Sequence, residues 1–334
     1  MADNPIILSL CIPTYNRSQL LMETLAEIAS QIRGGAFTES IEITVSDNAS
    51  SDDTQLKLKL FLEKNKDIKI KLHRQERNLG PDGNIYTVVK MASGTFIWIM
   101  SDDDLLFPKA LSLLIDLIKL HPDEGAFCPN IRGFTNQLED AGQEHFKVKS
   151  GTIKGKDEGL AHIGYMITFL SVLIFRRCLI SDCNYDDRLG TDIIHSYMFL
   201  DVLKASNSLY VVAEPLLGCR MFNSGGYNFF RILVNHFNSL LVTAEQTGFS
   251  KSIVAAIRRQ YLRGFLLDML YMFKTQGSVG RLQPNYFEAF NMMFPIYYKD
   301  PFFYSRIVPY LLCPSFLMRR LVKLKSSLEG RLAR

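Results

Sequence analysis

The segment TFIWIMSDDDLLFP spans residues 95–108 and joins a short apolar run to three consecutive aspartates. Thr95–Met100 has the length and composition of a buried strand, and Pro108 favours the start of a helix at Lys109–Leu120 because proline suits the first helical position. Adjacent carboxylates at the end of a buried strand repel one another unless solvent or a cation compensates them. The segment therefore predicts a strand that delivers acids to one edge of a sheet.

The residues before this segment alternate between strand-like and helical patterns. Apolar residues with strand-like spacing or helical spacing predict three strands and three helices. These are strands at Ile7–Cys11, Ile41–Val45 and Ile68–Leu72, and helices at Leu20–Ile32, from Asp52 or Asp53 to about Lys64, and at Asn84–Met91. Strands separated by helices pair in parallel within an open sheet covered by helices, so the fold class is α/β.

Ligands of such sheets bind beyond the carboxyl ends of the strands. Two of these ends carry acids here, namely Asp47 and the run Asp102–Asp104. The sequence thus predicts that both groups of acids lie at the same edge, which is the basis of the functional hypothesis.

The pattern changes in the second half of the chain. Arg132–Gly155 is polar and contains glycine, which predicts a loop or hairpin insertion over the site. Ser171–Phe175 and Leu209–Val212 are typical of strands, with a helix at Asp192–Lys204 between them. After about Phe229 the strand patterns stop, and the remainder predicts helices rich in Leu, Phe, Tyr and Met.

These patterns predict two regions. Residues 1–225 would form an α/β domain, with a first half at 1–130 and a second half at 131–225. Residues 226–334 would form a helical C-terminal region that ends in a basic amphipathic tail.

The composition is typical of a globular chain with a core, since 47% of the 334 residues are hydrophobic and 22% are charged. The net charge of +4 is mild, and we expect no nucleic-acid partner. The start of the chain lacks a basic signal-peptide pattern, and the 13-residue apolar run 163–175 is shorter than the about 20 residues that cross a bilayer as a helix. Six cysteines without zinc-type spacing predict unpaired thiols and a cytoplasmic location.

The acids themselves indicate a metal and a phosphate ligand. Mg²⁺ or Mn²⁺ prefers oxygen ligands, often one or two carboxylates together with substrate phosphates, and can neutralise a diphosphate leaving group. The alternative for Asp102–Asp104 is that the acids favour the N-terminus of the helix after Pro108. Asp47 could accept hydrogen bonds from a ribose or a base, or could form an ordinary Asx turn.

Four segments resemble motifs of glycosyl transferase family 2, whose members have the GT-A fold, and they occur in the family's order. They are Ile12–Arg17 (IPTYNR), Ser46–Asp52 (SDNASSD), Asn78–Pro81 with Asn84, and Gly94–Phe96 leading to the aspartates. The chain as a whole looks most similar to bacterial O-antigen transferases of the abequosyltransferase type. The family often has a further acid where Ser101 stands.

The resemblance implies transfer of a sugar, possibly a deoxy sugar, from a nucleotide diphosphate donor to a lipid-linked oligosaccharide in surface polysaccharide synthesis, with inversion at the sugar carbon. It implies Asp103 as the ligand of Mg²⁺ or Mn²⁺, with Asp104 or Asp102 assisting. The donor-binding residues that it implies are Pro13, Thr14, Asn16, Arg17, Asp47, Asn78, Gly80, Asn84, Asp102 and Arg220.

The resemblance implies a GT-A glycosyltransferase domain at 1–225, with a donor half at 1–130 and an acceptor half at 131–225. The acceptor half must supply a base, because direct displacement requires a group that takes the proton of the acceptor hydroxyl. The segment Asp186–His195 resembles the family's segment with the catalytic acid at a helix start, and Asp192 is the matching position. His195 could share a helix face with it, and an ordinary histidine pKa of about 6.5 also suits a base. The alternatives are a helix cap for Asp192 and a structural polar role for His195.

The segment Pro215–Gly226 resembles a later family loop that contains arginine and glycine. A guanidinium suits diphosphate oxygens, and glycines suit a mobile lid. The alternative is that Arg220 is a surface arginine beside a turn.

The tail is the last pattern. Leucines recur at helical spacing among basic residues, which suits the surface of an anionic membrane. The leucines are Leu317, Leu321, Leu324, Leu328 and Leu332, and the basic residues are Arg319, Arg320, Lys323, Arg331 and Arg334. The alternatives are packing on the tail's own domain and a homodimer interface. We expect a protein bound peripherally to the inner face of the plasma membrane.

Other classes of protein fit less well. A nucleotidyltransferase would need a glycine-rich loop near the first strand, and Pro13–Arg17 contains no glycine. A dinucleotide oxidoreductase would need G-x-G-x-x-G after that strand, which is absent. An inactive membrane-surface scaffold for partner transferases would not require the acids at Asp47 and Asp102–Asp104.

Overall fold

The computed structural model describes residues 5–221, 230–276 and 285–320. The chain divides into two compact units, Met1–Met221 and Phe222–Arg334. The boundary predicted at residue 225 lies in the segment 222–229, outside the described residues, so the position of that boundary stays a prediction.

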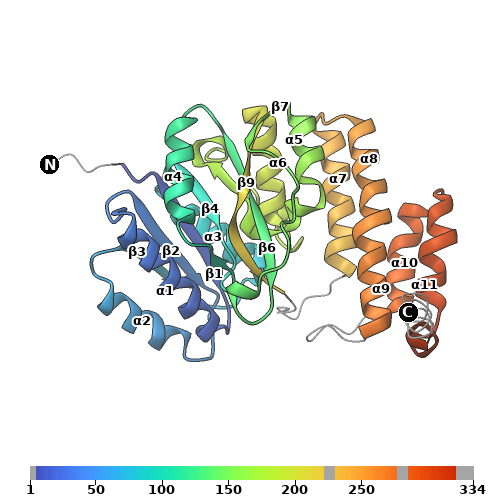
Figure 1. Ribbon diagram of the computed structural model, residues 1–334, viewed down its shortest axis with the longest axis horizontal. Coiled ribbons are helices and arrows are strands. Elements are labelled where there is room, and N and C mark those ends of the chain that lie inside the picture. Colours follow the sequence, from blue (N-terminus) through green and yellow to red (C-terminus); the bar gives the residue numbers. More distant parts are fainter. Residues whose placement is uncertain (1–4, 222–229, 277–284, 321–334) are drawn as a thin grey trace, which may run out of the picture. The chain divides into compact units, whose positions relative to one another are not determined.

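The first unit is built on one mixed sheet (Figure 1). The strands follow the order β3-β2-β1-β4-β8-β6-β9-β5, and β7 pairs with β9. Their bounds are β1 Leu8–Thr14, β2 Ile41–Asp47, β3 Lys69–Arg74, β4 Phe96–Ile99, β5 Leu105–Leu106, β6 Ala126–Phe134, β7 Gly151–Lys154, β8 Ile174–Arg176 and β9 Ser208–Arg220.

The strands β1 to β4 pair in parallel, as the alternation of strands and helices predicts. β2 is buried throughout and β1 nearly so, which is typical of parallel strands that are covered on both faces. β3 lies at the edge of the sheet, and its partly exposed lysines suit an edge strand.

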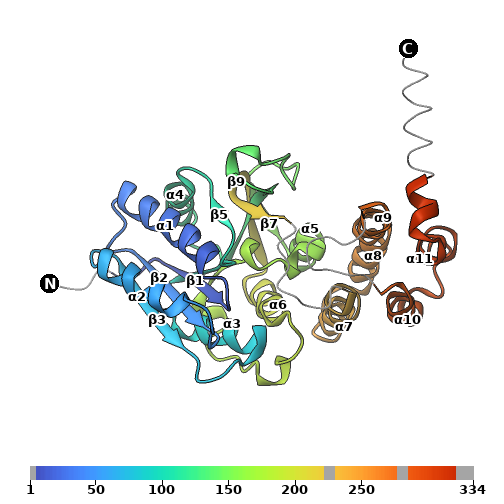
Figure 2. The same ribbon diagram turned by 90° about the horizontal axis from the view of Figure 1, so that it is seen from below.

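Helices cover both faces of this sheet. Figure 2 shows α1 and α4 on one face, and α3 and α6 on the other. The bounds are α1 Ser18–Gly34, α2 Thr54–Lys64, α3 Gly80–Met91, α4 Ala110–Leu120, α5 Lys156–Ile163 and α6 Ile194–Ser206, with short 3-10 turns η1 Leu138–Asp140, η2 Gly164–Thr168, η3 Leu170–Val172, η4 Arg177–Leu179 and η5 Asp186–Arg188. The apolar stripe predicted for the first helix is fully buried on α1, at Leu21, Leu25, Ile28 and Ile32.

Two helix starts differ from the predictions. α3 begins at Gly80, four residues earlier than predicted, because Gly80 has a left-handed backbone (φ 75°) that turns the chain directly into the helix. α4 begins at Ala110 after Lys109, which is also left-handed (φ 67°). Pro108 therefore precedes the helix and does not occupy its first position.

β8 runs antiparallel to both of its neighbours, β4 and β6, unlike the parallel strands β1 to β4. The turn η3 replaces the first two residues of the strand predicted at Ser171–Phe175. Together with η2 it delivers the chain to the carboxyl end of β4, where Ile99 N–H donates to the carbonyl oxygen of Leu173 over 3.3 Å. Because β8 starts at the carboxyl end of β4, it runs antiparallel to β4. The reversal brings Ser171 beside the aspartates that follow β4.

The predicted insertion at Arg132–Gly155 begins inside β6, which continues to Phe134 and pairs in parallel with β9. The same insertion supplies β7, which pairs antiparallel with β9. β9 has 13 residues and is long enough to pair with three strands. Its carboxyl-terminal part also pairs with β5.

In the second unit, every regular element of the described residues is helical, as predicted. The bounds are α7 Phe237–Gln246, α8 Lys251–Tyr261, α9 Leu267–Gln276, α10 Tyr286–Tyr297 and α11 Val308–Leu312, with π-helical turns η6 Arg231–His236, η7 Leu262–Leu266 and η8 Phe303–Ile307. Within residues 5–221, 230–276 and 285–320, no helix combines the length and apolar character that crossing a membrane requires.

Candidate active site

The three aspartates lie in a short loop between β4 and β5, which we call the acid loop (residues 101–104). The loop follows the carboxyl end of β4, beside β1, where Met100 N–H donates to the carbonyl oxygen of Cys11. All three aspartates are buried, with exposed fractions between 2% and 5%. Burial of three neighbouring carboxylates is unfavourable without compensation, so their partners decide what the loop can do.

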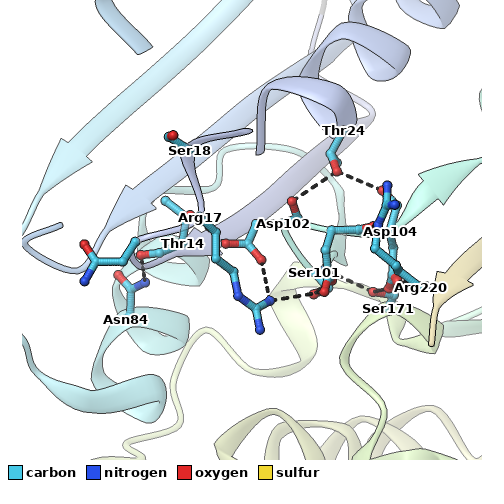
Figure 3. A network of polar contacts seen from close by, with 12 residues as sticks. Thr14, Arg17, Ser18, Thr24, Asn84, Ser101, Asp102, Asp104, Ser171 and Arg220 are labelled. Carbon is cyan, nitrogen blue, oxygen red and sulfur yellow. Dashed lines mark hydrogen bonds and ion pairs between the residues drawn. The ribbon is translucent and has the colours of Figure 1, made fainter. Parts of the chain in front are cut away.

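Residues of the first strand and its loop hold Asp102 (Figure 3), and Arg17 also holds Asp103. The Thr14 hydroxyl donates to Asp102 Oδ2 over 2.6 Å. The Arg17 guanidinium lies 3.0 Å from Asp102 Oδ1 and 3.2 Å from Asp103 Oδ2. Asp103 also accepts a hydrogen bond from the Ser101 hydroxyl. The end of β1 thus supplies both neutral and cationic compensation to the acids.

Three further segments fix the acid loop from other sides. Thr24 of α1 donates to the carbonyl oxygens of Asp102 and Asp104, over 3.2 and 2.9 Å. The Ser171 hydroxyl donates to Asp104 Oδ2 over 2.6 Å and accepts from Ser101 N–H. At the end of β9, Arg220 N–H donates to Asp104 Oδ1 over 3.0 Å.

The Arg220 side chain, predicted to contact a diphosphate, has partners within the protein. Its Nε donates to the Asp103 carbonyl oxygen over 3.1 Å, its guanidinium forms a salt bridge with Glu23 and it lies over the Phe134 ring. The predicted lid glycines follow in segment 222–229, outside the described residues.

Burial raises the pKa values of two aspartates of the acid loop, Asp102 and Asp104. Burial raises the pKa of Asp102 to about 6, although the nearby Arg17 cation and the Thr14 hydroxyl oppose the shift. Burial also raises the pKa of Asp104 to about 8, and the adjacent Asp103 charge contributes in the same direction. Both shifts follow from the cost of keeping charge away from water.

A second group of predicted donor residues ties three neighbouring loops together. Asn16 has a left-handed backbone (φ 53°), and its Oδ1 accepts from Ser51 N–H over 2.7 Å. Asp47 is fully buried, accepts from Ser50 N–H over 3.0 Å and binds the Gln55 side chain. In this conformation Asp47 orders the turn that follows β2, which is the Asx-type arrangement considered as the alternative for it.

The loop after β3 joins this group through Asn48. The Asn48 amide donates to Asn78 Oδ1 over 2.8 Å and to the Gly80 carbonyl oxygen over 3.1 Å, while its oxygen accepts from Leu79 N–H. Asn78 itself is exposed and Gly80 half-buried. The predicted loops after β1, β2 and β3 therefore do meet at one edge of the sheet.

Asn84 and Pro13 lie where β1 and β2 end. The Asn84 amide donates to the carbonyl oxygens of Thr14 and Ser46, over 3.2 and 3.0 Å, and its Oδ1 is buried without a hydrogen-bond partner. Pro13 pairs with Ser46 in the β1–β2 register. Asn84 thus connects α3 to the strand that carries Thr14, and through Thr14 to the acid loop.

The two candidate bases differ in accessibility. Asp192 is half-buried, precedes α6 and has a left-handed backbone (φ 61°). His195 is buried, its Nε2 donates to the Thr168 carbonyl oxygen over 3.0 Å, and its Nδ1 has no hydrogen-bond partner among the described residues. Burial lowers the pKa of His195. Geometry therefore favours Asp192 over His195 as the group that could meet an acceptor.

The sequence analysis missed several residues of this site. Thr24 and Ser171 act through single hydroxyl groups in elements that were assigned by their apolar pattern, and Asn48 acts through its amide in the segment Ser46–Asp52, where only Asp47 was predicted. Asp82 was also missed, although it binds the backbone of Asp192. No sequence pattern indicates such partners, since each lies far along the chain from the residue that it binds.

We tested whether the acid loop suits a divalent cation. Among the described residues, no three His, Cys, Asp or Glu side chains are arranged to enclose a metal ion together. A hard cation would thus rely on one or two carboxylates and on substrate phosphates, as Mg²⁺ commonly does. Both carboxylates use both oxygens. Asp104 binds the fully buried Ser171 hydroxyl and the Arg220 backbone N–H, whereas Asp103 binds two half-buried side chains, those of Arg17 and Ser101. Asp103 fits a metal ligand better than Asp104.

Comparisons with known proteins decide the family. The family model "Glycosyl transferase family 2" matches residues 9–178, about half of the chain, and this range contains the acid loop. The chain belongs to glycosyl transferase family 2.

Two relatives illustrate what the chain is similar to. The chain is 28% identical to the abequosyltransferase RfbV of Salmonella typhimurium over 228 residues, which are 64% of this chain and 67% of RfbV. It is 36% identical over 108 residues to the GalNAc(5)-diNAcBac-PP-undecaprenol beta-1,3-glucosyltransferase of Campylobacter jejuni, covering 32% of this chain and 33% of that one. The abequosyltransferase-like resemblance is confirmed.

Solved structures show the fold. S. aureus TarS in complex with UDP-GlcNAc matches 82% of this chain and 77% of its own, with a TM-score of 0.58 and 18% identity. The Pyrobaculum calidifontis mannosyltransferase PcManGT, in complex with GDP-Man and Mn²⁺, matches 95% of this chain and 89% of its own, with a TM-score of 0.54 and 17% identity. The GT-A fold predicted for this glycosyl transferase family 2 chain is confirmed.

Proposed function

We propose that this family 2 glycosyltransferase transfers a sugar, possibly a deoxy sugar, from a nucleoside diphosphate donor to a lipid-linked oligosaccharide of a bacterial surface polysaccharide, with inversion at the sugar carbon. The names of the relatives support the substrate classes. One is an abequosyltransferase, and two others use diphosphoundecaprenol-linked acceptors. A cytoplasmic protein at the inner face of the plasma membrane would meet both the donor and such an acceptor.

The observation that carries the proposal is the acid loop at the carboxyl ends of β1 and β4. Its carboxylates are balanced by one guanidinium, that of Arg17, which lies within salt-bridge distance of two of them. In open α/β sheets ligands bind at this edge. The loops of Asn16, Asp47 and Asn78 meet at the same edge, and we assign the nucleoside to them.

The metal belongs to the same proposal. We assign Asp103 as the protein ligand of Mg²⁺ or Mn²⁺, and leave Asp104 to hold the loop. When bound, such a cation would neutralise charge on the diphosphate leaving group. Arg17 is near enough to Asp103 to exchange its partner when the donor arrives, because it is half-buried and contacts two carboxylates.

The chemistry that we assign to the acceptor half is proton removal. The acceptor oxygen forms a bond to the sugar carbon, while the bond from that carbon to the diphosphate oxygen breaks. The Asp192 carboxylate takes the hydroxyl proton, and the nucleoside diphosphate leaves with the bonding electron pair. A positioned carboxylate is a common general base for such a step.

The metal assignment can be tested by thermal unfolding with UDP-glucose, UDP-GlcNAc, GDP-mannose and a nucleoside diphosphate abequose. We expect at least one donor to raise the melting temperature of the wild type only when Mg²⁺ or Mn²⁺ is present. Asp103→Asn should remove this rise, because a neutral amide is a poor ligand for a hard cation.

The matched control is Asp116→Asn, which neutralises an exposed carboxylate on α4. It should keep the metal-dependent rise. Full stabilisation of the Asp103→Asn protein, or equal stabilisation in excess chelator, would contradict the metal assignment.

The base assignment predicts a different pattern. Asp192→Asn should leave donor binding nearly unchanged but lower the turnover number by about 10² or more, the usual contribution of a positioned base. Steady-state kinetics of nucleoside diphosphate release would measure it. If His195→Ala shows that pattern and Asp192→Asn does not, then Asp192 is not the base.

We also propose that the second unit binds an anionic membrane surface. The tail beyond residue 320 lies outside the described residues. The aromatic face of α10 consists of Phe287 and Phe294 together with Tyr298, which directly follows the helix, and their exposed fractions are 75%, 42% and 45%. These residues are seven and four positions apart, so they share one side of the helix. Exposed basic residues of the same unit suit anionic headgroups. They are Lys299, Arg306, Arg319 and Arg320.

A further inference from the structure

Asp82 is a buried carboxylate of α3 that binds the backbone at the start of α6. Its exposed fraction is 2%. Oδ2 accepts from Asp192 N–H over 2.7 Å, and Oδ1 accepts from Ile194 N–H over 3.0 Å. The two helices are more than a hundred residues apart in the sequence, so this is a tertiary contact and not a local turn.

The contact with Asp82 supplies an N-terminal cap, which the sequence of α6 itself lacks. The residue that precedes α6, Ile193, has no side chain that could cap the helix. The first N–H groups of a helix have no partner within it, and a carboxylate near them is favoured by hydrogen bonding and by the helix dipole. Asp82 therefore acts as a cap provided by a neighbouring helix.

The same contact fixes the conformation of Asp192. Asp192 has a φ of 61°, in the left-handed region that side-chain-bearing residues rarely adopt. The two hydrogen bonds lie on either side of residue 193, so they hold the peptide groups that precede Asp192 and Ile194 against one rigid carboxylate. Without that carboxylate, the backbone at Asp192 would relax toward a commoner conformation and its side chain would point elsewhere.

α3 also connects to the acid loop. Two residues after Asp82, the Asn84 amide donates to the Thr14 carbonyl oxygen, and the Thr14 hydroxyl donates to Asp102. A continuous path thus runs from Asp192 through Asp82, Asn84 and Thr14 to the acid loop. Asp192 and the acid loop would have to keep a constant separation for Asp192 to act as the base on a sugar bound at the acid loop.

We propose that Asp82 is a positioning residue, which sets the place of the Asp192 carboxylate relative to the acid loop. This inference rests on the proposed function of Asp192 as base. A helix cap with only a structural role would change stability but not the turnover of folded enzyme. A positioning role changes turnover, and only while Asp192 is present to be positioned.

The experiment is a double-mutant cycle with Asp82→Asn and Asp192→Asn in the full chain. The probe is release of nucleoside diphosphate from whichever of UDP-glucose, UDP-GlcNAc, GDP-mannose or nucleoside diphosphate abequose the wild type uses fastest, normalised to the folded fraction. We expect Asp82→Asn to lower kcat about tenfold or more while the KM for the donor changes less than about twofold, because a small displacement of a catalytic group is costly. Adding Asp82→Asn to Asp192→Asn should cause no further loss.

The matched control is Glu124→Gln. Glu124 is also a buried carboxylate that accepts two hydrogen bonds, from Thr152 and Ser208, but these belong to β7 and β9. This variant should lose stability and keep kcat. If Asp82→Asn does not fold, Asp82→Ser replaces it, since a hydroxyl can still accept one of the two N–H groups.

The outcomes separate the inference from the function beneath it. Unchanged kcat in Asp82→Asn, or equal fold losses in the wild-type and Asp192→Asn backgrounds, would overturn the positioning role while leaving Asp192 as the base. Wild-type turnover in Asp192→Asn would instead overturn the base assignment. A loss that appears only in the KM would assign Asp82 to donor binding and also overturn the proposal.

Discussion

His195 shows how burial decides the role of a single titratable side chain. Its imidazole donates one hydrogen bond to the Thr168 carbonyl oxygen, and its other nitrogen has no partner. Protonation would place a charge and an unsatisfied donor in the interior, so burial lowers the pKa below its ordinary value of 6.5. A base must be reachable by its substrate, and this ring is 4% exposed.

The lowered pKa of His195 predicts a pH dependence of stability. Below about pH 6.5 the unfolded chain protonates this histidine while the folded chain does not, so the free energy of unfolding falls as the pH falls. We expect His195→Gln, which keeps a donor for the Thr168 carbonyl oxygen, to reduce the slope of the unfolding free energy against pH. The reduction is up to about 1.4 kcal/mol per pH unit, which corresponds to the binding of one proton. Urea unfolding from about pH 7.5 to about pH 5.5 would measure it.

The control for this measurement is His73→Gln, which replaces an exposed histidine of β3. It should leave the slope unchanged. A slope in His195→Gln as steep as that of the wild type would show that this ring does not titrate differently in the folded chain.

At the scale of elements, α1 supports the acid loop through one hydroxyl. The Thr24 side chain is 1% exposed, and it donates to two carbonyl oxygens of the loop. Thr24→Val keeps the shape but removes the donor, and leaves buried carbonyl groups unsatisfied. We expect a loss of about 1–3 kcal/mol in the free energy of unfolding, together with weaker metal-dependent donor binding.

Urea unfolding and donor titration would check both expectations for Thr24. Thr243→Val is the matched control, because Thr243 donates to a carbonyl of its own helix, α7. It should cost less and leave donor binding intact. Unchanged stability and unchanged donor binding in Thr24→Val would show that the acid loop does not need this support.

Comparison of particular elements shows how far the sequence alone could predict the fold. The buried strands β1, β2 and β4 and the stripe of α1 follow from local periodicity, which one element carries by itself. The reversal of β8 does not, because it depends on where η2 and η3 deliver the chain. Nor does the cap of α6, because its carboxylate comes from another helix.

The residues of the candidate site also fall into those that are visible in the sequence and those that depend on packing. Consecutive acids after an apolar strand are visible in the sequence, so the acid loop and Asp103 could be predicted. The family resemblance supplied Asp192, but the sequence did not distinguish it from His195. The distinction comes from burial, which is a property of the packed molecule.

At the scale of the whole molecule, we expect the aromatic face of α10 to bind a lipid surface. The protein should co-sediment with vesicles that contain anionic phospholipid but not with neutral vesicles, and salt should release it, because each basic residue near such a surface contributes about 1 kcal/mol that salt screens. Phe287→Ser with Phe294→Ser should weaken binding about tenfold or more, since two phenyl groups would no longer enter the interface.

The control pair is Leu56→Ser with Leu120→Ser, which removes two exposed leucines from α2 and α4 of the first unit. It should bind vesicles like the wild type. If the phenylalanine pair leaves vesicle binding unchanged but halves the molar mass in solution, the aromatic face is a homodimer interface and the membrane proposal fails.

The partners of the acid loop also have a consequence for biosynthesis. Ser171 and Arg220 reach Asp104 from 67 and 116 residues further along the chain. A ribosome that has just completed the acid loop has therefore made all three aspartates but only their earlier partners, and contacts of such long sequence separation form late in folding. We expect chains that end before Ser171 to leave the Asp104 carboxylate without either of these partners, so that quality-control proteases would remove such truncated copies.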